Sequence, residues 1–93
     1  VNSIMTFFYI TVLIIAVSTG NPAFLQHKQG WNNREMCLNY VSLPKTQDHI
    51  EQSLYNHYGK DEIEKIVGIT CMSKEEVEAS NAELKKYLEE LET

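Results

Sequence analysis

The stretch that decides the fold is the run Phe7–Val17, FFYITVLIIAV, near the start of the chain. Every residue in this run is apolar or aromatic except Thr11. Crossing the hydrocarbon core of a membrane takes about 20 apolar residues, so the run is too short for an ordinary transmembrane helix. Its length is instead typical of the apolar core of a secretory signal peptide.

Small residues follow the apolar run at the positions that a signal peptidase reads. Ser18 and Gly20 supply them, which predicts cleavage before Asn21. We therefore assign residues 5–20 to a signal peptide and residues 1–4 to leader or read-through sequence. No Lys or Arg precedes the run, which leaves an uncleaved signal anchor and a buried core helix as alternatives. The prediction is a secreted, extracellular protein that is free of the membrane after cleavage.

The composition excludes several classes of function. The chain has eight Lys and Arg residues and thirteen Asp and Glu residues, which gives a net charge of −5. Nucleic-acid binding requires a basic stripe that contacts phosphates, which an acidic chain with scattered Lys and Arg does not provide. A chain this short forms one small domain with little room for a cleft that excludes water. No nucleophile motif such as G-x-S-x-G is present, so we expect neither an enzyme nor a cofactor.

The two cysteines, Cys37 and Cys71, are predicted to form a disulfide. Small exported domains commonly need such a cross-link because their hydrophobic cores are small. A bond between these residues would close a loop of about 35 residues and stabilise the fold by roughly 3.5–4 kcal/mol. Two intermolecular bonds that join a homodimer are the alternative, and the spacing does not separate the two arrangements. The intramolecular bond is our prediction.

The remainder of the chain predicts an all-α fold, a small bundle of three to four short helices after the cleaved signal peptide, held by one disulfide. Residues 21–32 show no sustained period and are expected to be a flexible lead-in. Residues 33–93 are expected to form the small helical domain. Its first helix can be capped by Asn33 or the asparagine before it, and it ends before Pro44.

A second helix is predicted from the spacing of three apolar or aromatic residues. Ile50, Leu54 and Tyr58 recur at four-residue steps and would form one stripe. Thr46 is placed to cap the start of this helix, and Gly59 is placed to end it.

The last two elements are also predicted to be helical. Asp61 and Glu64 resemble a capping box ahead of a short third helix. The β-branched run at 66–70, IVGIT, would suit a strand, but the predicted mature chain offers it no strand partner. Ser73 and Glu76 form the S-x-x-E capping box of the final helix.

The histidines do not predict a metal site. His49 and His57 are separated by eight positions, which places them about 12 Å apart along a helix axis, too far to bind one ion. His27 falls in the predicted lead-in. We therefore expect no metal.

Two classes of function remain. The first is a small secreted non-enzymatic binding protein that acts on another protein, as an effector, venom or salivary-type component. The aromatic residues that suit such an interface are Trp31, Tyr55 and Tyr58. The alternative is a secreted helical carrier of a small hydrophobic ligand. The residues expected to line its pocket, or else to fill an ordinary core, are Met36, Tyr40, Leu54, Ile66, Leu84 and Leu88.

Overall fold

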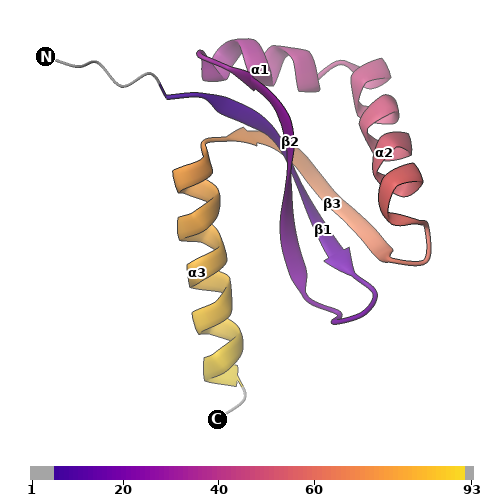
Figure 1. Ribbon diagram of the computed structural model, residues 1–93, viewed down its shortest axis with the longest axis vertical. Coiled ribbons are helices and arrows are strands. Elements are labelled where there is room, and N and C mark those ends of the chain that lie inside the picture. Colours follow the sequence, from indigo (N-terminus) through magenta and orange to yellow (C-terminus); the bar gives the residue numbers. More distant parts are fainter. Residues whose placement is uncertain (1–5, 92–93) are drawn as a thin grey trace, which may run out of the picture.

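The computed structural model describes residues 6–91 and shows an α+β fold (Figure 1). Within that range, three antiparallel strands form one sheet, accompanied by three helices. The elements in chain order are β1 (Phe8–Ala16), β2 (Pro22–Trp31), α1 (Arg34–Val41), α2 (Pro44–Tyr58), β3 (Ile63–Met72) and α3 (Lys74–Leu91).

The predicted all-α bundle is therefore wrong. The apolar run assigned to a cleaved signal peptide is β1, the expected flexible lead-in is β2, and the expected third helix is β3. The described fold requires that β1 be retained, because cleavage before Asn21 would remove it. The predicted leader, residues 1–4, lies outside the described residues.

β1 is the central strand of the sheet, whose order is β2-β1-β3. Val12 lies opposite Leu25 on one side and opposite Ile69 on the other. Ile10, Val12 and Ile14 are all buried on one face, as the two-residue period of a strand requires. Leu13 and Ile15, on the other face of β1, are half-buried, so both faces carry apolar side chains and the apolar run is continuous.

The helix boundaries follow local signals, some of which the sequence revealed. The Asn33 side chain accepts a hydrogen bond from the Met36 N–H at 3.1 Å, which confirms the predicted cap of α1. Gly59 ends α2 with a φ of 91°, also as predicted. Thr46 is not the cap of α2, because Pro44 already occupies its first turn. None of the helices within residues 6–91 has the length and apolarity needed to cross a membrane.

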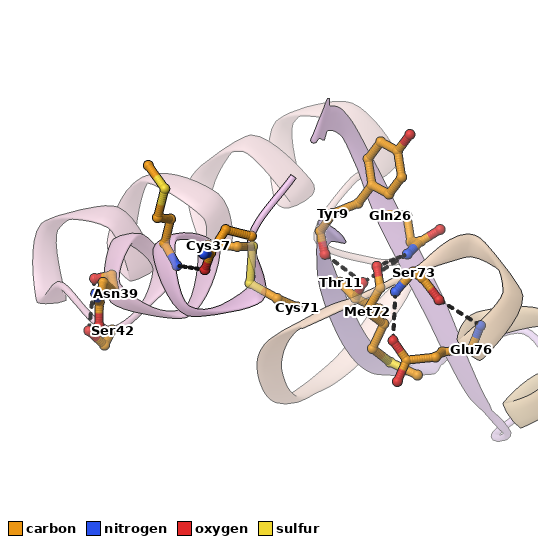
Figure 2. Close-up of a disulfide and its surroundings, with 12 residues drawn as sticks. Tyr9, Thr11, Gln26, Cys37, Asn39, Ser42, Cys71, Met72, Ser73 and Glu76 are labelled. Carbon is orange, nitrogen blue, oxygen red and sulfur yellow. Dashed lines mark hydrogen bonds between the residues drawn. A yellow bond between two sulfur atoms is a disulfide. The ribbon is translucent and has the colours of Figure 1, made fainter. Parts of the chain in front are cut away.

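The predicted intramolecular disulfide is confirmed. It joins Cys37 of α1 to Cys71 near the end of β3, with a Cα–Cα distance of 6.1 Å (Figure 2). Both cysteines are buried, at 0% and 2% exposure, among the side chains of the hydrophobic core. The bond therefore fixes α1 against the face of the sheet that carries the core.

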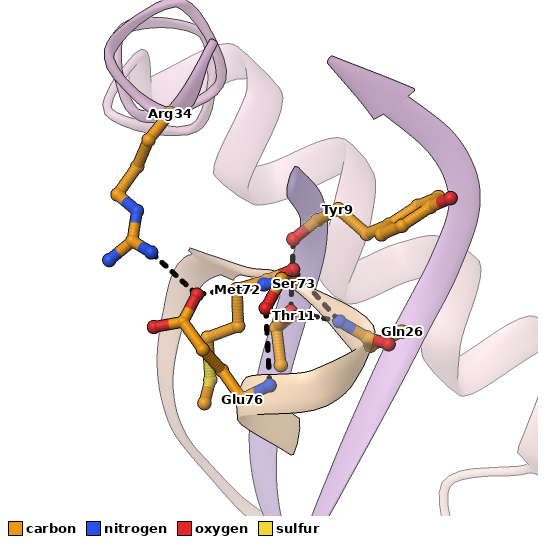
Figure 3. A network of polar contacts seen from close by, with 7 residues as sticks. All are labelled: Tyr9, Thr11, Gln26, Arg34, Met72, Ser73 and Glu76. Atoms are coloured by element: carbon orange, nitrogen blue, oxygen red, sulfur yellow. Dashed lines mark hydrogen bonds and ion pairs between the residues drawn. The ribbon is translucent and has the colours of Figure 1, made fainter. Parts of the chain in front are cut away.

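The predicted capping box at the start of α3 is also confirmed (Figure 3). The Ser73 N–H donates to Glu76 Oε1 at 3.0 Å, and the Glu76 N–H donates to Ser73 Oγ at 3.1 Å. Arg34 of α1 forms an ion pair with the same carboxylate. The backbone hydrogen bond from Ser73 is the largest cause of the lowered pKa of Glu76; burial opposes it to a lesser extent, and the Arg34 guanidinium lowers this pKa further.

A half-buried side-chain amide links all three strands next to this cap (Figure 3). Gln26 Nε2 of β2 donates to Thr11 Oγ1 of β1 and to the Met72 carbonyl of β3, both at 3.0 Å. The Thr11 hydroxyl, which is fully buried, donates to the Tyr9 carbonyl at 2.9 Å. These bonds fix β2 at Gln26, which is itself one of the residues that line the cleft described below.

We predict that a chain beginning at Asn21 does not fold. β2 and β3 each pair with β1 and not with each other, so removal of β1 leaves neither strand with a partner. The expected result is loss of cooperative unfolding, measured by circular dichroism during a urea titration. A cooperative transition in the 21–93 chain would contradict the fold and would support the signal-peptide interpretation.

We predict that reducing the disulfide lowers the free energy of unfolding by about 4 kcal/mol. The bond spans a sequence separation of 34, and closing a loop of that size restricts the unfolded chain by about this amount. Urea unfolding of the oxidised and reduced protein measures the difference with no change of side chain. A difference below about 1 kcal/mol would show that the bond does not constrain the unfolded chain in this way.

We predict that Glu76→Gln destabilises the protein by about 0.3–1 kcal/mol at neutral pH, because the variant loses the carboxylate that accepts from the Ser73 N–H and pairs with Arg34. The lowered pKa means that the native state binds this proton less tightly than the unfolded state does. Its stabilising contribution is therefore complete above about pH 4.3, the ordinary value for Glu, and is lost as pH falls through the lowered pKa. The variant and the native protein should converge in stability as the pH falls below the lowered pKa of Glu76.

Urea unfolding at several pH values measures this convergence. Glu75→Gln is the matched control, because Glu75 lies in the same helical turn but is not part of the capping box. A difference between Glu76→Gln and the native protein that persists unchanged in acid would contradict the assigned role of the charge.

Candidate functional site

The candidate site is an open cleft of about 460 Å³ between α2 and the sheet. Apolar residues form its inner surface, with Ile10 and Val12 from β1, Leu25 from β2, and Ile50 and Leu54 from α2. Sites for small molecules commonly measure about 300–1,000 Å³ and are mainly apolar, with a few polar groups. The cleft meets both conditions.

Two neighbouring rows of residues on α2 line the cleft. The predicted stripe Ile50, Leu54 and Tyr58 supplies one row. His49, Ser53 and His57 stand at the same four-residue spacing, one position earlier, and supply the second. Because residues four apart lie on one face of a helix, both histidines reach the cleft. The eight-residue spacing that argued against a shared metal ion is therefore compatible with two histidines along one wall.

A bulge in β2 forms the opposite wall. Tyr9 pairs with Gly30 and Thr11 pairs with Gln26, so the three residues between Gln26 and Gly30 face a single residue of β1. Bulges of this kind redirect side chains and are common beside functional sites. The three bulged residues, His27, Lys28 and Gln29, all line the cleft. We use the term β2 bulge for His27–Gln29 below.

A hydrogen bond within the β2 bulge orients the His27 imidazole. The Gln29 N–H donates to His27 Nδ1 at 3.0 Å. In the neutral imidazole the proton is then on Nε2, so that nitrogen is the free donor. His27, Lys28 and Gln29 are all exposed to solvent, so their polar groups remain available to a ligand.

The cleft differs in charge from the rest of the molecule. The chain carries a net charge of −5. Among the described residues that line the cleft there is no Asp or Glu, whereas Lys28 and all three histidines of the chain are present. An acidic protein thus presents a basic and hydrogen-bond-donating rim above an apolar floor.

The residues predicted to line one pocket are found in different parts of the structure. Tyr40 and Leu54 line the cleft, whereas Ile66 packs against the core and Met36 is exposed. Leu84 and Leu88 lie on α3, where they line a second, more open cavity with the residues around Asn21. Sequence reasoning missed the β2 bulge and the row that contains Ser53, because the fold that joins them was not predicted.

The three predicted interface residues also have different surroundings. Trp31 and Tyr55 are half-buried and pack against the core. Tyr58 is exposed and lines the cleft. The Trp31 ring lies tilted by 37° against the ring of Tyr40, a residue that lines the cleft, with 5.4 Å between the ring centroids. Trp31 is the single tryptophan of the chain, so its fluorescence reports on the cleft.

Among residues 6–91 the polar side chains show neither a metal-binding cluster nor a buried group without a hydrogen-bond partner. No group of three or more His, Cys, Asp or Glu side chains within residues 6–91 is arranged to hold a metal ion. In the same range, every buried side-chain nitrogen or oxygen has a hydrogen-bond partner. What the cleft offers is an apolar surface with several hydrogen-bond donors at its rim.

No protein-family model, curated protein or solved structure matches this chain.

Proposed function

We propose that the protein is a small, non-enzymatic carrier that binds a small ligand with an apolar body in the cleft between α2 and the sheet. The observation that supports this most directly is the cleft itself, with an apolar inner surface and a volume of about 460 Å³. Removing apolar ligand surface from water contributes roughly 25 cal/mol per Å² to the binding free energy. Contact with the Ile, Val and Leu side chains of the floor is therefore enough to bind such a ligand. A carrier of a small hydrophobic ligand was the alternative function predicted from the sequence. The proposal retains that function but places the ligand between α2 and the sheet and not among helices.

Secretion is part of the same proposal. The disulfide supports an oxidising compartment such as the extracellular space, because thiols are kept reduced in the cytosol. The signal for export would have to leave β1 in the mature protein, since β1 pairs with both of its neighbours.

Binding to another protein is the second candidate, and exposed apolar side chains away from the cleft support it. Val67 of β3 is 49% exposed, and Tyr87 and Leu91 of α3 are 59% and 65% exposed. Large exposed side chains of this kind are suited to a protein interface. An effector, venom or salivary-type component would use such a surface to bind its target protein. Blocking the cleft would not affect that binding.

We predict that Ser53→Phe weakens binding of a neutral apolar ligand about tenfold or more. Ser53 is exposed on α2 and lines the cleft, so a phenyl ring at this position would occupy ligand space. Steric overlap of this kind costs about 1–3 kcal/mol. The measurement is a calorimetric titration with decanol, supported by the fluorescence of Trp31.

Gln52→Phe is the matched control, because Gln52 is exposed on the same helix but does not line the cleft. The control should bind decanol as the native protein does, and circular dichroism should show both variants folded. Equal binding of decanol by both variants, or no binding of either decanol or its carboxylic-acid analogue decanoate by the native protein, would contradict the carrier proposal. It would leave protein binding as the better candidate.

A further inference from the structure

We infer that the ligand of the cleft is an amphipathic carboxylic acid, with its apolar chain on the floor and its carboxylate at the β2 bulge. This inference rests on the proposed function and adds the chemical class of the ligand. It follows from three features of the described cleft, which are its charge, its hydrogen-bond donors and the separation of its polar and apolar parts.

The charge of the rim selects for an anion. Lys28 supplies a positive charge to a cleft that has no acidic residue among its described lining. In a chain with thirteen acidic and eight basic residues, a random surface of this size would be expected to include carboxylates. Charge complementarity of this kind discriminates between ligands even where each exposed pair contributes little affinity.

The donors of the rim suit a carboxylate in particular. The hydrogen bond at His27 Nδ1 leaves the Nε2–H of the neutral imidazole as a donor, next in sequence to Lys28. His49 and His57 on α2 line the opposite wall of the same cleft. A carboxylate accepts hydrogen bonds through two oxygens, so it can use donors from more than one side chain. A neutral alcohol has neither the charge nor the second oxygen.

The polar and apolar parts of the cleft match the two ends of such a ligand. Ile10, Val12 and Leu25 form the floor on the sheet. Lys28 and the three histidines are exposed at the rim, where a bound carboxylate would remain partly hydrated. The ion pair would therefore avoid the large desolvation cost of a buried charge.

The experiment compares decanoate with decanol, which share an apolar chain and differ in the head group. Calorimetric titration of the native full chain is expected to show decanoate binding more tightly. Lys28→Gln is expected to weaken decanoate binding roughly two- to fivefold, the effect of one exposed ion pair, and so to lower the ratio of decanoate affinity to decanol affinity. Lys45→Gln is the matched control, because Lys45 is exposed on α2 and does not line the cleft.

The outcomes separate this inference from the function on which it rests. Tighter decanoate binding that depends on Lys28 and not on Lys45 supports the carboxylate assignment. Equal affinities for decanoate and decanol, or a preference that survives Lys28→Gln, overturn the assignment while the carrier function stands. Binding of neither compound overturns both.

Discussion

The pairing of β1 with both of its neighbours is the constraint on which the rest of the structure depends. Every strand-to-strand hydrogen bond of the described sheet involves β1, because its order is β2-β1-β3. The buried side chains of Ile10, Val12 and Ile14 then form the floor on which α1 and α2 pack. The disulfide adds to this arrangement and does not replace it, since one of its cysteines belongs to β3, which needs β1 as its partner.

The sequence predicted most of the local features of the fold and one long-range contact, the disulfide, but not the pairing of the strands. The caps at Asn33, Ser73 and Gly59 were predicted because each depends on residues within a few positions. β1 was not predicted, because a central strand and the core of a signal peptide are both short, continuous apolar runs. That single error also determined the assignment of β3, whose β-branched residues suited a strand but had lost their partner.

The candidate site was harder to predict than the fold, because its two walls come from distant segments. The stripe on α2 that includes Leu54 was visible as a helical period, and it does line the cleft. The β2 bulge was not visible, since it is defined by the register between two strands and not by its own residues. Each histidine was unremarkable when read alone. The register of β2 against β1 brings His27 to the same cleft as the histidines of α2.

α2 is held in place both by its own packing on the core and β3 and by its connection to α1. The short connection from α1 to α2 is reinforced by Gln47, whose Nε2 donates to the Val41 carbonyl at 3.0 Å. α1 is itself tied to β3 by the disulfide. The disulfide therefore affects the cleft indirectly, because it holds α1, and α1 is connected to α2 by a short loop. A ligand that bridges α2 and the β2 bulge would stabilise the same arrangement from the other side, since binding to the native state alone adds to its stability. Oxidation and ligand binding are for this reason expected to reinforce one another, although the cysteines and the cleft share no residue.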